Sequence, residues 1–224
     1  MTKNSSFGAV MDVASRPPIV FVAGDGSWLR DSEGGSFLDF VQGWAVNCLG
    51  HTPRPVIAAL ARQAERLINC SPAFYNEPMI RLSGLLAVHS GLHQVFLSNS
   101  GAEANEGAIK LARKWGTLHR DGAFEIVTME HGFHGRTLAT MSASGKSQWE
   151  RLYEPKVPGF VKVPFNDLGA IAAALTSRTV ARSLAGACGI VARPRRREMS
   201  RVHRHPRRDG RVAVWPGSAG RAAT

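Results

Sequence analysis

The distribution of apolar and polar positions divides the chain into a strand-rich start and a longer part with helical spacing. Near the start, short apolar runs are separated by turns that contain Gly and Asp. Glycine beside aspartate is typical of hairpins because glycine tolerates a positive φ. The pattern therefore predicts a meander of three strands, Ile19–Ala23, Ser27–Arg30 and Ser36–Phe40.

From residue 55 onward, apolar residues recur with the helical period, and short apolar runs later alternate with these stretches. The spacing predicts helices over Pro55–Leu67, Pro78–His89, Ser100–His119, Arg136–Ala143 and Asp167–Leu175. It predicts strands over Val95–Ser98, Phe124–Glu130, Phe160–Phe165 and residues 179–181. Alternation of this kind indicates an α/β domain with a largely parallel sheet.

The pattern stops after Ala181. Residues 182–224 are mostly Arg, Ala, Gly and Pro and show no hydrophobic period. They carry 11 Arg against two acidic residues, whereas residues 1–181 carry 17 Lys and Arg against 15 Asp and Glu. The formal charge of +11 therefore belongs mainly to this segment. Its composition predicts a disordered Arg-rich tail.

Composition also narrows the class of protein. No run of about 18 apolar residues is present, which argues against a membrane span, and the first residues do not resemble a secretion signal. The three cysteines are odd in number and far apart, so they suggest neither a zinc site nor a redox pair. A reducing cytoplasm is the expected location.

The first candidate for chemistry is the sequence 98–106, SNSGAEANE, which follows a predicted strand and opens a predicted helix. Ser100 and Glu103 have the spacing of a capping box. The small residues Gly101 and Ala102 would leave the free N–H groups of the first turn open to an anion, which the helix dipole also favours. From the residues alone, this turn is either a phosphate-binding cup or simply a well-capped helix.

The second candidate is the sequence 130–137, EHGFHGRT, which follows the next predicted strand. Loops at the carboxyl ends of strands form the sites of open α/β sheets. A phosphate cup beside an aromatic side chain would suit a flat phosphorylated ring. His131 and His134 offer metal binding as an alternative, but their spacing is not that of a zinc protease and no third ligand is near.

These two motifs, together with the sequences 17–51 and 71–82, resemble class III pyridoxal-phosphate-dependent aminotransferases. The resemblance extends from about Pro17 to Ala181 and is closest to the acetylornithine branch. It implies an incomplete fold-type I transferase, with residues 1–70 from the small domain, 71–181 from the large cofactor-binding domain, and 182–224 unrelated. The ligands it implies are pyridoxal 5'-phosphate, an amino-acid substrate and a 2-oxo acid, and it implies a homodimer at full length.

The resemblance also implies roles for individual residues. Ser100, Gly101 and Ala102 would hold the cofactor phosphate, and Phe133 would stack on the pyridine ring. Arg136 would bind the substrate carboxylate, for which a planar guanidinium is suited. His134 would support the loop. Less specific matches link Tyr75 and Asn76 with the dimer interface, and Trp44 and Asn47 with the substrate side, while His51 is expected to be structural.

The chain departs from the family in lacking the lysine that forms the Schiff base with the cofactor, and the paired aspartate. None of its lysines stands in the matching context: Lys3, Lys110, Lys114, Lys146, Lys156 and Lys162. No catalytic residue is therefore predicted, and we expect the chain to be inactive. The abrupt change of composition suggests a frameshift near codon 181.

Two other functions fit the sequence less well. A catalytically inactive fold could bind nucleic acid through its arginines, although residues 182–224 hold a single aromatic residue, Trp215, and no nucleic-acid motif. Alternatively, the chain could be a non-catalytic partner that dimerises with an intact paralogue.

Overall fold

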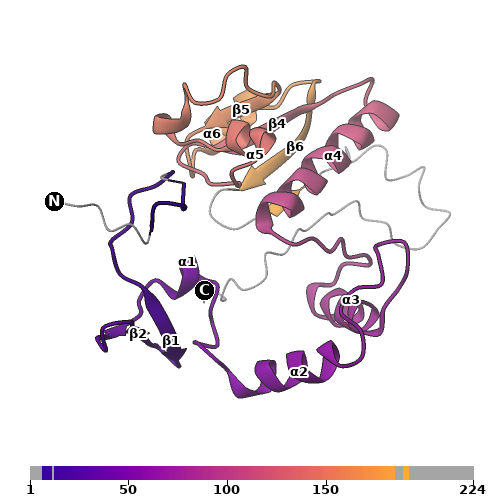
Figure 1. Cartoon of the computed structure of the whole chain (residues 1–224). Coiled ribbons are helices and arrows are strands. Elements are labelled where there is room, and N and C mark those ends of the chain that lie inside the picture. Colours follow the sequence, from indigo (N-terminus) through magenta and orange to yellow (C-terminus); the bar gives the residue numbers. More distant parts are fainter. Residues whose placement is uncertain (1–6, 12, 185–188, 192–224) are drawn as a thin grey trace. The chain divides into compact units, whose positions relative to one another are not determined.

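The computed structural model describes residues 7–11, 13–184 and 189–191 (Figure 1). Residues 7–69 belong to one compact unit, and the described residues from Cys70 onward form a second. Most of the predicted Arg-rich tail lies outside the described residues.

The first unit contains the predicted meander. Strands β1 (Phe21–Asp25), β2 (Trp28–Asp31) and β3 (Ser36–Leu38) form an antiparallel sheet in the order β1-β2-β3. Asp31 closes the turn between β2 and β3, because its carboxylate accepts hydrogen bonds from the backbone N–H groups of Glu33 (3.0 Å) and Gly35 (2.6 Å). This confirms the prediction that Gly and Asp form the turns between the strands.

Asp39 organises the backbone that follows the meander, around α1 (Gln42–Ala45). Its carboxylate accepts hydrogen bonds from Gln42 N–H (2.9 Å) and Val41 N–H (2.8 Å) and pairs with the His51 ring (2.8 Å). The Gln42 hydrogen bond, helped by His51, holds the pKa of Asp39 below its ordinary value against the opposing effect of desolvation. The backbone of His51 in turn bridges Gly26, so His51 has a structural role here.

Two helices lie at the predicted positions but bury no side chain. Helix α2 spans Arg54–Ala64 and α3 spans Glu77–Ser90. Helix α3 begins where the Asn76 side chain accepts a hydrogen bond from Met79 N–H (2.9 Å), and it ends at Gly91, whose φ of 69° is left-handed. No described side chain of either helix is buried.

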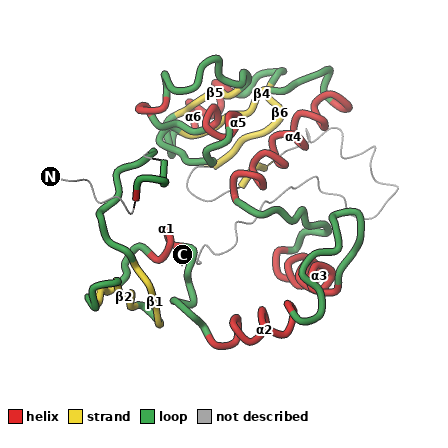
Figure 2. The backbone as a smooth tube through the Cα atoms, viewed as in Figure 1, coloured by secondary structure: helices red, strands yellow, loops and turns green. Residues whose placement is uncertain are grey.

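The second unit is built on a mixed sheet of four strands in the order β5-β4-β6-β7. Strands β5 (Phe160–Val163) and β6 (Thr179–Leu184) run parallel to β4 (Glu125–Met129), and β7 (Gly189–Val191) runs antiparallel to β6. Besides α3, this unit has the helices α4 (Gly101–His119), α5 (Leu138–Ala143) and α6 (Leu168–Ala174), and a 3-10 turn spans Ser147–Trp149. Figure 2 separates the yellow strands from the red helices around them.

Strand β4 is buried on both faces, as the central strand of an α/β sheet must be. Its side chains alternate between two apolar clusters. On one face Ile126 packs with residues of α4 and β6, together with the partly buried Ala139 of α5. On the other face Val127 and Met129 pack with Val163 and with Ile171 of α6. The sheet therefore lies between α4 and α5 on one side and α6 on the other.

One prediction about a strand was wrong, and the sheet extends further than the sequence pattern indicated. Residues 95–98 form no strand: Phe96 lies against α4 at Gly107, and none of the strands that the structure describes pairs with this segment. The sheet extends a short way past Ala181, since β6 continues to Leu184 and residues 189–191 form β7. The outer edge of β6 offers unpaired backbone groups, which β7 satisfies.

Within the residues that the structure describes, no helix is long and apolar enough to cross a membrane.

Gly116 allows α4 to pack on the segment that leads into β4. A Cβ atom at this position would overlap the Ala123 carbonyl oxygen and lie 3.1 Å from a methyl group of Val180. Gly84 in α3 is the matched position, because a Cβ atom there meets nothing within 4 Å.

We expect Gly116→Ala to lower the free energy of unfolding by about 2–3 kcal/mol, because a side chain forced into a packed interior shifts the backbone. Urea unfolding followed by circular dichroism measures the change. Gly84→Ala should cost nothing, since alanine favours an exposed helix by roughly 0.5–1 kcal/mol over glycine. Equal effects of the two substitutions would contradict this account of the packing.

Candidate functional site

The N-terminus of α4 has the predicted capping box. Ser100 is the N-cap, and its hydroxyl accepts a hydrogen bond from Glu103 N–H (3.2 Å). The Glu103 carboxylate reaches back to Asn99 N–H (2.6 Å). The sequence 98–106 therefore begins a helix of 19 residues with its first turn fixed from both sides.

The first turn of α4 retains the features of an anion site. An N-cap hydroxyl satisfies one of the N–H groups that have no acceptor inside the helix. Because Ser100 takes the N–H of Glu103, those of Gly101 and Ala102 remain. Both residues are small and partly exposed, and the dipole of a long helix favours negative charge at this end.

The loop after β4 carries the second predicted motif. It begins at the carboxyl end of the central strand, where Glu130 forms a bridge to Gly145. Phe133 is 47% exposed, and Arg136 is also exposed, whereas His134 between them is 4% exposed. The loop therefore presents an aromatic ring and a guanidinium to solvent and buries the residue that anchors them.

Three contacts join this loop to one face of α4. Gly135 approaches so closely that a Cβ atom would lie 2.8 Å from the Ala102 side chain. The Asn105 amide donates to the His134 carbonyl oxygen (2.7 Å). In addition, the Thr137 hydroxyl donates to the Glu106 carboxylate.

Positions 102, 105 and 106 lie on one side of a helix because they are three and four residues apart. The two motifs found in the sequence are therefore parts of one site. Glu106 faces the loop as well, because its carboxylate accepts the hydrogen bond from the Thr137 hydroxyl.

An aromatic and cationic cluster borders Phe133 and Arg136. The Phe133 and Trp149 rings meet edge to face, with centroids 5.8 Å apart. The Arg136 guanidinium lies 5.9 Å from the Trp149 centroid. Lys146 Nζ lies 5.1 Å from Trp149 and 5.2 Å from Phe133.

Sequence reasoning missed Trp149 and Lys146, whose only signal was an aromatic residue and a lysine shortly after the loop. Within the described part of the chain, neither Arg136 nor Lys146 has an ion pair with a carboxylate. The cluster therefore leaves positive charge available to an anionic ligand.

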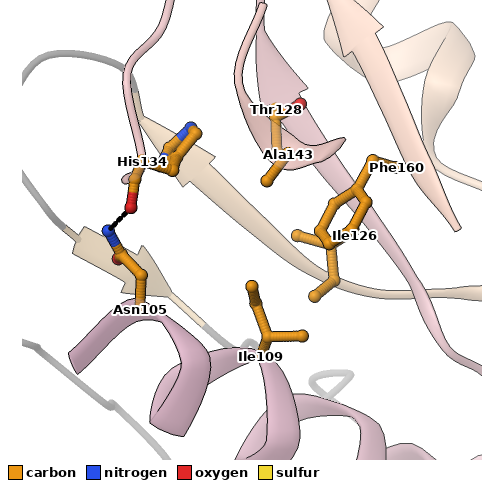
Figure 3. A pocket seen from close by; sticks show the side chains of 7 residues that line it. All are labelled: Asn105, Ile109, Ile126, Thr128, His134, Ala143 and Phe160. Atoms are coloured by element: carbon orange, nitrogen blue, oxygen red, sulfur yellow. Dashed lines mark hydrogen bonds between the residues drawn. The ribbon is translucent and has the colours of Figure 1, made fainter. Parts of the chain in front are cut away.

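His134 faces the interior and not the exposed side of the loop. Its ring lines a cavity of about 10 Å³ with Asn105, Ile109, Ile126, Thr128, Ala143 and Phe160 (Figure 3). This space is the size of a water molecule. Burial lowers the pKa of His134 below its ordinary 6.5, so the ring is neutral near pH 7. A ligand of the loop must therefore lie on the side of Phe133 and Arg136.

A metal site has little support in this loop. His131 is exposed whereas His134 is buried, so their side chains occupy different environments. Among the residues that the structure describes, no three His, Cys, Asp or Glu side chains gather as metal ligands.

The less specific candidates are placed as follows. Asn76 caps α3, and the neighbouring Tyr75 is 84% exposed. Trp44, in the first unit, is 89% exposed. Within the described part of the second unit, no contact joins Tyr75 or Asn76 to Phe133 or Arg136.

Comparison with known proteins links this geometry to one family. The family described as Aminotransferase class-III matches residues 10–186. The acetylornithine aminotransferase of Ralstonia nicotianae is 60% identical over 176 residues, which are 77% of this chain and 44% of the relative. The acetylornithine aminotransferase of Methanocaldococcus jannaschii is 44% identical over 173 residues. The chain thus spans less than half the length of these curated relatives.

Solved structures give the same result. The ornithine aminotransferase from Toxoplasma gondii matches with a TM-score of 0.76 and 30% identity. The match covers 89% of this chain and 48% of the ornithine aminotransferase chain. The N-acetylornithine aminotransferase from Stenotrophomonas maltophilia matches with a TM-score of 0.64 and 32% identity. This match covers 83% of this chain and 44% of the other. The predicted α/β fold of this family is therefore confirmed.

The burial of His134 predicts how the free energy of unfolding depends on pH in the acid range. Its folded pKa lies below the unfolded value of 6.5, so the unfolded chain binds more protons as the pH falls below 6.5. This contribution to the free energy of unfolding is complete above pH 6.5 and is lost progressively as the pH falls. Urea unfolding at pH values from 7.5 to 5.5 should show this decline, and His134→Gln should make it shallower.

His93→Gln is the control, since His93 is exposed. It should leave the pH dependence unchanged. An NMR titration of His134 in the unaltered chain tests the same point without a substitution. A titration midpoint at or above 6.5 would contradict the assignment of a buried neutral ring.

Proposed function

Because this chain belongs to the class III aminotransferases, we propose that residues 100–136 are the cofactor- and substrate-binding part of an acetylornithine-type aminotransferase. The observation that carries the proposal is the contact of Gly135 with Ala102. It brings an anion-binding helix end and a loop with an exposed aromatic ring and guanidinium into one site. Pyridoxal 5'-phosphate combines the phosphate and flat ring that such a site would bind.

Ser100, Gly101 and Ala102 would hold the cofactor phosphate. The free N–H groups of Gly101 and Ala102 would donate to phosphate oxygens, and the short side chains leave room for the anion. The Ser100 hydroxyl already accepts from Glu103 N–H, and its own hydrogen remains available as a further donor. Phosphate binding at this turn thus needs no rearrangement of α4.

Phe133 would stack on the pyridine ring, and Arg136 would bind the substrate carboxylate. Phe133 is half exposed while Trp149 holds its edge, so the ring has a defined orientation before any ligand binds. Arg136 is not neutralised by a carboxylate in the described part of the chain. A guanidinium offers two parallel N–H donors to a carboxylate.

The reaction that we propose for the family member is the exchange of an amino group and a carbonyl oxygen between N2-acetylornithine and 2-oxoglutarate, in arginine biosynthesis. When bound, pyridoxal phosphate supplies an electron sink for the carbon that loses the amino group. The residues described here bind and orient the two ligands. The many acetylornithine aminotransferases among the relatives support this choice of substrate.

We propose that the 224 residues do not catalyse this exchange on their own. None of the six lysines stands in the sequence context of the family's nucleophile. Lys146, the one beside Phe133, packs against two aromatic rings. The expected behaviour is therefore reversible binding of the cofactor without covalent attachment.

A second copy of the chain is the partner that we propose, and a reducing cytoplasm is the proposed location. The apolar residues of α2 and α3 support a partner, because no described side chain of these helices is buried. Cys48 and Cys70 form no disulfide in the described part of the chain, which agrees with a reducing compartment.

The phosphate cup predicts that the chain binds pyridoxal 5'-phosphate with higher affinity than pyridoxal. We expect pyridoxal to bind at least tenfold more weakly, since one hydrogen bond to a charged group contributes about 1.5–3 kcal/mol. Phe133→Ala should weaken binding of the phosphorylated cofactor about fivefold to tenfold, because aromatic contacts contribute roughly 0.5–1.5 kcal/mol beyond buried area. Equilibrium dialysis with absorbance detection measures both.

Leu118→Ala is the control for Phe133→Ala, because Leu118 is an exposed apolar residue at the opposite end of α4. It should leave the affinity unchanged. Equal affinities for the two aldehydes would indicate a general reaction with lysines and would sink the proposed cofactor site. Borohydride reduction that fixes one equivalent of cofactor on a single lysine would overturn the proposal that this chain is inactive.

Arg136 predicts binding of a carboxylate. Quenching or enhancement of Trp149 fluorescence by 2-oxoglutarate should report it, since the guanidinium lies 5.9 Å from the Trp149 centroid. Arg136→Ala should weaken binding about tenfold, as expected for one charge-assisted hydrogen-bonded pair. Arg151→Ala, which removes an exposed neighbouring cation, should have little effect at constant ionic strength. Comparable losses in both variants would mean that binding is non-specific.

A further inference from the structure

The backbone at His134 is held from both sides. The Asn105 amide donates to its carbonyl oxygen at 2.7 Å (Figure 3). The His134 N–H donates to the Ser144 hydroxyl at 3.0 Å. Ser144 in turn donates to the Thr140 carbonyl oxygen at 2.8 Å, so α5 holds the acceptor in place. Both hydrogen bonds to His134 are buried, where an unsatisfied backbone group is costly.

These two hydrogen bonds affect the orientation of two exposed side chains nearby in the sequence. Phe133 precedes His134 directly, and Arg136 follows two residues later. The peptide groups that Asn105 and Ser144 fix set the directions in which the two flanking side chains leave the loop. Phe133 and Arg136 both reach the Trp149 ring, at centroid distances of 5.8 and 5.9 Å, which defines the arrangement that the loop now has.

Asn105 itself is only 1% exposed and therefore cannot meet a ligand. Its position on α4 is one turn beyond the phosphate cup. A donor is needed here, because the group that it contacts is a carbonyl oxygen. An ionised aspartate has no proton to donate, and alanine would leave the carbonyl oxygen buried without its partner.

We propose that Asn105 is a positioning residue that couples the first turns of α4 to the loop, so that Phe133 and Arg136 are held in register with the phosphate cup. Only the identity of the ligands rests on the proposed function. The coupling itself acts through the His134 carbonyl oxygen and exists without a ligand.

The first test uses no ligand. The 224-residue chain labelled with 5-fluorotryptophan gives a fluorine NMR resonance for Trp149, assigned through Trp149→Phe. We expect Asn105→Ala to shift or broaden this resonance, because Phe133 and Arg136 lose their fixed orientation against the ring. Ser144→Ala, which removes the acceptor on the other side of His134, should act in the same direction.

Ile171→Ala is the matched control for lost stability. Ile171 is 8% exposed and packs on the other face of the sheet, away from the loop. It should lower the free energy of unfolding and leave the Trp149 resonance in place. A Trp149 resonance that is unchanged in both Asn105→Ala and Ser144→Ala, or that moves equally in Ile171→Ala, would overturn the proposal.

The second test measures affinity for pyridoxal 5'-phosphate at a temperature where each variant is folded. Asn105→Ala should bind about tenfold more weakly, the effect of one buried hydrogen bond, and Ile171→Ala should bind as the unaltered chain does. A stability change without an affinity change in Asn105→Ala would reduce Asn105 to a structural residue. If the unaltered chain binds no cofactor, the proposed function fails, and the fluorine experiment still decides the coupling.

Asn105→Asp adds a pH signature. A buried carboxyl group has a raised pKa, and its protonated form can donate to the His134 carbonyl oxygen. The Trp149 resonance of this variant should therefore return toward its normal position as the pH falls, while that of Asn105→Ala should not. A resonance of Asn105→Asp that follows Asn105→Ala at every pH would count against the hydrogen bond as the cause.

Discussion

The loop after β4 can lie against the first turn of α4 only because both contact positions carry almost no side chain. Gly135 and Ala102 meet at a distance that leaves no room for a larger residue. Gly135 also has a φ of 131°, which L-residues with a Cβ atom rarely adopt. This contact determines the separation of the helix end from Phe133 and Arg136. The hydrogen bonds of Asn105 and Glu106 then keep the loop against the helix at this short distance.

The central strand provides the frame for this contact. Because β4 is buried on both faces, its direction is fixed by two apolar clusters, and the loop leaves its carboxyl end at a defined point. Helix α4 packs on the same strand through Ala108, Ile109 and Ala112. Loop and helix end are thus positioned by one common element. The backbone of the site is fixed where it packs on these apolar clusters, whereas its proposed ligand-binding side chains are exposed.

Much of this arrangement could be predicted from the sequence. The capping box at Ser100 and the apolar run of β4 are local patterns, and they were confirmed because local geometry decides them. Residues 95–98 have a strand composition but lack a pairing partner among the described strands, which no local pattern reveals. The same limit applies to Glu106, whose partner Thr137 lies 31 residues further along the chain. Trp149 and Lys146 were missed because only the tertiary structure brings them to Phe133. The assignments of cofactor and substrate residues remain predictions.

The contacts along α4 have a consequence for how this segment can change. Ala102, Asn105 and Glu106 meet the loop from a single face of the helix, and each residue of an α-helix turns by about 100°. Inserting or deleting one residue between Ala102 and Asn105 would carry Asn105 and Glu106 away from their partners while leaving the cup intact. Exposed positions such as Lys110 can exchange one side chain for another without this effect. In this helix, length is therefore a stricter requirement than the identity of most of its residues.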